Sequence, residues 1–285
     1  MLQRSLTALV GLPVLIAAVW LGAPWLTLLV LAAGAIAICE LYRMTPTGVG
    51  PLPVLLGVSW VVALLSGAQA ASGRDNFLII SGGVMASGSF IALLWFIAYY
   101  RVGDSAGRSN YLIGFAYLVF GPAYVGFLLA TALMLREITS EDSPDLGRSW
   151  LLFALLVTFA VDTGAYGVGR AIGKRPIAPS ISPNKTWEGC VGGLTSAVGA
   201  ALVLGLVFDL EAPVWQQAVI GAVVGVVAQW GDLVASKLKR IADVKDAGSI
   251  IPGHGGLLDR LDSILLALPA VYYMLVTVFA PRTPF

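Results

Sequence analysis

The chain has 285 residues, of which 58% are hydrophobic and only 12% are charged, and its formal net charge is +1. A soluble domain carries about twice this share of charged residues, so the composition excludes an ordinary soluble domain. The net charge says little about partners, and we expect no nucleic-acid partner.

The apolar residues fall in blocks close to 20 residues long, the length at which a helix crosses about 30 Å of hydrocarbon. A membrane β-barrel would instead need segments of about ten residues with alternating polarity. We therefore predict an all-α, polytopic transmembrane helix bundle. It has about nine spans, at residues 6–21, 25–42, 52–68, 77–99, 111–135, 150–168, 189–208, 214–235 and 261–280.

The first predicted span has the basic start and the apolar run of a secretory signal peptide. It lacks a convincing small-x-small cleavage site and another apolar block follows at once, so we interpret it as a retained first helix. Because it is short and only residues 22–24 join it to the second span, the pair could instead be one re-entrant hairpin. Pro122, inside the fifth predicted span, is expected to kink it.

The distribution of basic residues predicts the orientation. With nine spans, the N-terminus and every second loop share one side of the membrane. That side holds every Lys and Arg except Arg74, Arg136, Arg148 and Arg282. The positive-inside rule therefore predicts a cytoplasmic N-terminus and a C-terminus outside. We expect a multi-pass protein of the inner (plasma) membrane whose functional loops face the cytoplasm.

The chain changes character near residue 150. We interpret residues 1–149 as N-terminal transmembrane helices that form a scaffold and the lipid-binding and dimer region. Residues 150–285 form a second transmembrane region, with two cytoplasmic polar loops at 169–188 and 236–260 that are rich in Gly, Pro, Lys, Arg and Asp. We predict that this second region is catalytic.

The first polar loop follows an ionisable residue within a span. Asp162 is costly to place in a membrane, so it indicates a functional role. Farther on, Ser182 and Pro183 are typical of the cap and first position of a helix. The free N–H groups of such a helix, with Lys185 and Thr186 nearby, predict a phosphate site. An ordinary capped helix with a snorkelling lysine would explain the same residues.

The second polar loop begins on a helix that leaves the membrane. Asp232, Ser236, Lys239 and Arg240 are spaced so that they share one stripe of that helix. The loop then continues with Lys245 and Asp246.

A glycine-rich turn follows, because Gly255, Gly256 and their neighbours permit backbone conformations that other residues resist. It contains His254, and the next helix carries Asp259 and Asp262 on one face. Such aspartates, combined with basic residues, suit a Mg²⁺–nucleotide site, since Mg²⁺ takes few protein ligands and substrate phosphates complete its shell. A single histidine with no nearby cysteine does not suit zinc. A basic loop that binds anionic lipid headgroups is the alternative, but it leaves the interleaved aspartates unexplained.

The pattern S-x2-K-R-x4-K-D-x-G-x3-P-G-H-G-G-x2-D-R-x-D, from Ser236 to Asp262, resembles the signature of the phosphatidate cytidylyltransferase (CDP-diacylglycerol synthase) family. The stretches "DTGAY", "SPNKTWEG" and "GD" at Gly231 resemble other typical parts of that family. The resemblance covers residues 162–263, and the first 150 residues match only as hydrophobic helices. Ala235 departs from the pattern, because many bacterial members carry Glu there.

The resemblance implies a nucleotidyltransferase that converts CTP and phosphatidic acid into CDP-diacylglycerol and pyrophosphate, with Mg²⁺ and a monovalent cation such as K⁺ beside it. It also implies homodimers in the lipid bilayer. It assigns Asp232 and Asp259 to the divalent metal, with Asp262 as a further candidate.

On this hypothesis, the basic groups of the second loop hold phosphates: Lys239, Arg240, Lys245 and Arg260. His254 orients a phosphate or protonates the departing pyrophosphate. The remaining substrate-binding candidates are Ser182, Lys185, Thr186, Ser236, Asp246, Gly255 and Gly256.

Three alternatives remain open. A CDP-alcohol phosphatidyltransferase would need a D-G-x2-A-R run that the sequence lacks. Another CTP-dependent membrane lipid transferase or kinase, similar to dolichol kinase, would share most of the motif chemistry with a different acceptor. A transporter of phosphate-bearing solutes predicts two related halves with broken helices, whereas the polar residues here gather in one half.

Overall fold

The computed structural model describes residues 2–45, 51–71, 73–100, 105–140, 143–251 and 255–279. Within these ranges, eight helices are long and apolar enough to cross a membrane. They correspond to the second through ninth predicted spans and confirm an all-α polytopic bundle. The chain forms two compact units, the first made of Met1–Met134 and Ile241–Asp259, the second of Leu135–Arg240 and Arg260–Phe285.

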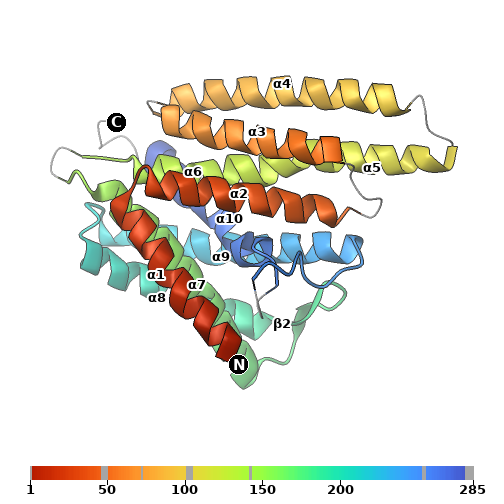
Figure 1. Ribbon diagram of the computed structural model, residues 1–285. Helices are drawn as coiled ribbons and strands as arrows, with labels where there is room; N and C mark the ends of the chain where they lie inside the picture. The colour runs from red at the N-terminus through yellow and green to blue at the C-terminus, as the bar shows by residue number, and fades with distance from the viewer. Residues whose placement is uncertain are drawn as a thin grey trace. The chain divides into compact units, whose positions relative to one another are not determined.

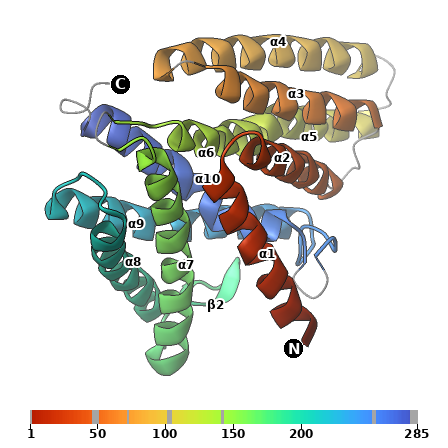
Figure 2. The same cartoon turned by 60° about the vertical axis from the view of Figure 1, so that its left-hand side comes forward.

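The first unit is built from consecutive helices. They are α1 (Leu2–Leu21), α2 (Trp25–Arg43), α3 (Pro51–Ala70), α4 (Arg74–Tyr100), α5 (Ser105–Gly121), the π-helix η1 (Pro122–Phe127) and most of α6 (Leu128–Arg136). Helices α2 to α5 run alongside one another in both views (Figures 1 and 2).

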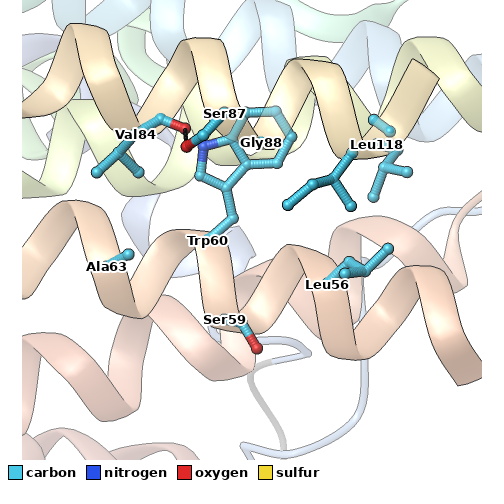
Figure 3. A pocket seen from close by; sticks show the side chains of 10 residues that line it. Leu56, Ser59, Trp60, Ala63, Val84, Ser87, Gly88 and Leu118 are labelled. Atoms are coloured by element: carbon cyan, nitrogen blue, oxygen red, sulfur yellow. Dashed lines mark hydrogen bonds between the residues drawn. The ribbon is translucent and has the colours of Figure 1, made fainter. Parts of the chain in front are cut away.

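Close helix packing in this unit depends on small residues. The indole ring of Trp60 on α3 lies against Gly88 of α4, where any Cβ would overlap the ring (Figure 3). An apolar cavity of about 210 Å³ remains beside the ring, bordered by Leu56, Ala63 and Leu118 among others. Glycine therefore brings two membrane helices closer than larger residues would permit.

At Pro122 the helical hydrogen bonding changes from α to π, so the regular α-helix is interrupted there, and the expected kink stays a prediction. Proline has no N–H to donate and its ring clashes with the carbonyl one turn earlier, so the regular ladder cannot continue through it. The fifth predicted span is thus α5, η1 and α6 in succession.

The first predicted span forms the helix α1, as expected. Its apolar stretch in the described part of the chain, Gly11–Leu21, is shorter than the other eight candidate spans. Whether α1 crosses the membrane, and with it the predicted orientation of the two termini, stays a prediction.

The second unit contains α7 (Leu146–Ile172), the strands β1 (Pro176–Ala178) and β2 (Ser182–Thr186), α8 (Trp187–Phe208), α9 (Val214–Ile241), most of α10 (Leu258–Tyr273) and the π-helix η2 (Met274–Val278). Helices α7 and α8 lie side by side (Figure 2). Gly192 faces Val168, and Gly193 faces Ala165, at distances that leave no room for a larger side chain.

Candidate active site

The second unit places α9 against α10 at a single glycine. A Cβ on Gly231 would overlap the carbonyl oxygen of Asp262 and approach the Cα of Ser263. Only glycine permits this approach, and the next residue on α9 is Asp232. The glycine therefore brings the carboxylate of one predicted motif to the helix that carries another.

Asp232 forms an ion pair with Lys185 of β2, with 2.5 Å between Nζ and Oδ2. The two side chains are 24% and 31% exposed, so solvent screens the pair only in part. Ser236, one turn along α9, donates a hydrogen bond of 3.2 Å to Oδ1 of Asp232. The structure thus brings Lys185 of the first polar loop to Asp232 on α9, two residues that the sequence analysis treated separately.

A second carboxylate reaches this place from α7. Oδ1 of Asp162 accepts a hydrogen bond of 3.4 Å from the Ser263 hydroxyl. Asp162 and Asp262 both lie within electrostatic range of Asp232, and the cations Lys185 and Arg260 act on Asp162. Three aspartates from α7, α9 and α10, together with these cations, form what we call the carboxylate cluster: Asp162, Asp232, Asp262, Lys185 and Arg260.

The expectation that Ser182 and Pro183 open a helix is wrong. Both residues lie in β2, which pairs with β1 in antiparallel register, Ala178 opposite Ser182 and Pro176 opposite Thr186. The helix α8 begins at Trp187, and Thr186 is its cap, accepting the Gly189 N–H at 3.1 Å. Strand pairing outweighs the local helix-start signal, because extended backbone at 182–186 satisfies its groups across the hairpin.

The hairpin is held at both ends. A carboxylate oxygen of Glu188 accepts the backbone N–H groups of Lys174 and Arg175, at 3.1 and 3.2 Å. Arg240, at the end of α9, donates from Nε to the Ile181 carbonyl at 3.3 Å. Figure 2 shows β2 beside α7, where Thr186 also approaches Gly169 and Gly173. These contacts fix the strand that carries Lys185.

In the first unit, Asp259 organises the glycine-rich loop. Its Oδ2 accepts the N–H groups of Ala247 at 2.8 Å and Gly256 at 2.9 Å. Gly255 has φ +81°, a conformation that favours glycine, and forms a bridge with Ile251. The predicted turn is confirmed for the residues described, and His254 lies outside them.

One residue of this loop's surroundings was missed by the sequence analysis. Glu40 on α2 is completely buried, and its carboxylate accepts the N–H groups of Leu257 at 3.0 Å and Leu258 at 2.8 Å. The signal was available, because Glu40 lies within the second predicted span, where an ionisable residue indicates a function as it did for Asp162.

The other predicted residues divide between the two units. The second unit contains Lys239, which is half-buried, and the exposed residues Arg240 and Arg260. Lys245 and Asp246 are exposed in the first unit, next to Gly255 and Gly256 in the loop. Asp232 and Asp259 belong to different units, so their joint role at one metal stays a prediction.

The residues present fit a magnesium ion better than a caged transition metal. Among the described residues, no three His, Cys, Asp or Glu groups are placed to hold a metal ion. The carboxylate cluster nevertheless offers hard oxygen donors, and Mg²⁺ uses one or two carboxylates and takes its remaining ligands from water and phosphate. Ala235 is buried and supplies no ligand, whereas Asp162 and Asp262 contribute carboxylates close to Asp232.

The fold and this cluster define a polytopic helical membrane protein with a polar site among α7, α9, α10 and the hairpin that carries Lys185. Residues 2–278 match the model of the cytidylyltransferase family. The phosphatidate cytidylyltransferase of Bacillus subtilis (strain 168) is 34% identical over 277 residues, 96% of this chain and 97% of that protein. The enzyme of the same name from Staphylococcus saprophyticus is 34% identical over 275 residues, 96% of this chain and 99% of that protein.

The chain therefore belongs to the cytidylyltransferase family, which confirms the resemblance read from the motif. The similarity is also wider than the motif region, because it includes the first 150 residues.

Proposed function

We propose that this protein transfers the cytidylyl group of CTP to phosphatidic acid, which gives CDP-diacylglycerol and pyrophosphate in phospholipid biosynthesis. The observation that carries the proposal is the Lys185–Asp232 ion pair, since it brings a cation of the first polar loop to the aspartate of α9 that the family resemblance assigns to the metal. The curated bacterial relatives bear the name of this activity over almost their whole length.

The substrates match the surroundings of such a site. Phosphatidic acid is a membrane lipid and CTP is a cytoplasmic nucleotide, so the enzyme must work where water meets the bilayer. Eight candidate membrane spans and bacterial relatives support a multi-pass plasma-membrane protein. We place the site on the cytoplasmic side, as the distribution of Lys and Arg predicts, and we expect a homodimer.

The reaction needs positioning and charge neutralisation more than a strong base. A phosphate oxygen of phosphatidic acid attacks the α-phosphorus of CTP in line, a new P–O bond forms, and the bond to the β-phosphate oxygen breaks as pyrophosphate leaves. An ionised phosphate monoester is already nucleophilic. Side chains that hold the two anionic substrates together therefore supply most of the rate enhancement.

The residues divide by charge. Five basic residues would neutralise the phosphates. They are Lys185, Lys239, Arg240, Lys245 and Arg260. Asp232, with Asp262 and Asp259, would hold Mg²⁺, and a monovalent cation such as K⁺ is proposed beside it. Bound Mg²⁺ would neutralise charge that develops on the phosphate oxygens. His254 is proposed to orient a phosphate or to protonate pyrophosphate.

Incubation of the purified protein in liposomes with phosphatidic acid and cytidine-labelled CTP tests the proposal. We expect a labelled lipid and free pyrophosphate, both dependent on phosphatidic acid and a divalent cation. Asp232→Asn is expected to abolish both products. Labelled nucleotide that crosses sealed vesicles without any bond cleavage would contradict the proposal and favour the transporter. Label in a lipid made from a different acceptor would favour another CTP-dependent enzyme.

A further inference from the structure

Glu40 stands out as a carboxyl side chain buried within the first unit. It lies in the last turns of α2, a helix of 19 residues whose basic residue in the last turn is Arg43, and its side chain has no exposed surface. Burying a carboxylate is costly unless it is hydrogen-bonded or paired. The contacts that compensate this cost show what the residue does.

Those contacts are made with one short segment, more than 200 positions later in the chain. Oε1 accepts the N–H of Leu257 and Oε2 accepts the N–H of Leu258, where α10 begins. The first N–H groups of a helix lack partners within the helix, and its N-terminus attracts negative charge. Glu40 therefore serves as a cap supplied by a distant helix.

The glycines of the loop make room for this carboxylate. A Cβ on Gly248 would lie 2.5 Å from Oε1 of Glu40, and a Cβ on Gly256 would lie 2.6 Å from Oε2. Both distances are far below normal contact, so any other residue at either position would displace the carboxylate. Two glycines of the motif are thus explained by Glu40 as well as by the turn.

Glu40 and Asp259 both bind backbone N–H groups of the same loop. Glu40 comes long before the loop in the chain, and Asp259 follows it directly. Asp259 binds the N–H groups of Ala247 and Gly256, and Glu40 binds those of the next two residues, Leu257 and Leu258. The three consecutive amides at 256–258 are therefore fixed by two carboxylates. One of these carboxylates belongs to the residue that we assign to the metal.

We propose that Glu40 is a positioning residue for cytidylyl transfer. Its carboxyl oxygens fix the glycine-rich loop, and so the orientation of the Asp259 side chain toward Mg²⁺ and CTP. It acts through Asp259 and touches neither substrate. The inference rests on the proposed function, because it assigns Asp259 to that reaction.

The test compares Glu40→Gln and Glu40→Asp with a control on the same helix. Gln keeps the shape but has one oxygen acceptor in place of two, whereas Asp keeps the charge on a shorter side chain. Thr27→Val is the control, because it removes an interhelical hydrogen bond of 2.6 Å from α2 to Gln69 and leaves the loop untouched. Binding of Mg²⁺–CTP without phosphatidic acid is measured by calorimetry, and KM, kcat and thermal unfolding are measured beside it.

Mutation of a residue that orients a metal ligand typically lowers metal affinity or activity by about 10- to 100-fold. We therefore expect Glu40→Gln to weaken Mg²⁺–CTP binding and to raise KM for CTP by at least about tenfold. Glu40→Asp should recover part of the loss, and Thr27→Val should keep the wild-type affinity. Hydrogen exchange of the peptide covering residues 247–258 should be faster in Glu40→Gln.

Unchanged Mg²⁺–CTP affinity in a folded Glu40→Gln protein would overturn the inference. So would an activity loss that Thr27→Val reproduces at equal loss of thermal stability. Failure of the wild-type protein to make CDP-diacylglycerol would count against the proposed function instead. In that event, the hydrogen exchange of the peptide 247–258 still tests Glu40 by itself. Equal exchange rates in wild type and Glu40→Gln would show that Glu40 does not hold the loop.

Discussion

The ion pair between Lys185 and Asp232 gives the sharpest test of the site. Lys185→Met keeps an unbranched apolar side chain and removes the terminal ammonium group with its charge. Asp232 then remains near Asp162 and Asp262 without its cation. We expect two effects of opposite sign, a loss of catalysis and a gain in the affinity of the site for a divalent cation alone.

The magnitude follows from the geometry. At 2.5 Å, two unit charges in an effective dielectric of about 20 attract by at most about 7 kcal/mol. Desolvation of the ions and the partial exposure of both side chains reduce the net value to about 2 kcal/mol. If Lys185 delivers the same amount to a substrate phosphate in the transition state, kcat/KM falls about 30-fold.

The assay measures CDP-diacylglycerol formation over a range of CTP concentrations, and Mn²⁺ binding by electron paramagnetic resonance as a substitute for Mg²⁺. Lys174→Met is the matched control, because this exposed lysine is bound through its backbone N–H and keeps that contact. Full activity in Lys185→Met would refute the phosphate role of Lys185. Mn²⁺ binding weaker than in wild type would refute the argument that Lys185 competes with the metal for Asp232.

Further predictions concern the metal, the helix contact and the topology. Asp259→Asn should lower activity at least 100-fold at saturating CTP, and near-normal pyrophosphate release would remove Asp259 from the metal site. Gly231→Ala should force α9 away from Asp262, with a cost of about 1–3 kcal/mol in thermal unfolding and a loss of activity. Gly199→Ala in α8, where a Cβ meets nothing within 4 Å, should show neither change. Single cysteines placed at the two termini should react with an impermeant maleimide from outside only at the C-terminus, and equal labelling of both would mean that α1 does not cross the membrane.

The membrane-spanning architecture was readable from the sequence because hydrophobicity and helix length are local properties. Eight of the predicted spans recur as helices of suitable length, and Pro122 interrupts its helix where its chemistry requires. The chemical class was readable for a related reason. Aspartates, basic residues and glycines stand close together in the two polar loops, so their composition and spacing carried the family resemblance.

The local signal failed at Ser182 and Pro183. Both residues favour a helix start, but the segment pairs with Pro176–Ala178 and the helix begins only at Trp187. A capping preference amounts to about 1 kcal/mol, and a strand partner that satisfies several backbone groups can exceed it. The phosphate site at Lys185 stays a prediction, and the structure places this lysine in the hairpin with its ammonium group against Asp232.

By itself, then, the sequence determined which segments enter the membrane, which residues carry the charge chemistry, and the family. The tertiary structure decided which of those charges meet. Lys185 of the β-hairpin reaches Asp232 of α9, and Glu40 reaches Leu257 and Leu258 across 217 and 218 positions. Such pairings depend on close approaches that glycines permit: Gly231 lets α9 approach α10, and the loop residues Gly248 and Gly256 make room for the Glu40 carboxylate. Helical or strand periodicity reports only the face of one element. For this reason the sequence predicted a role for Asp259 but left the contacts of Glu40 to the structure.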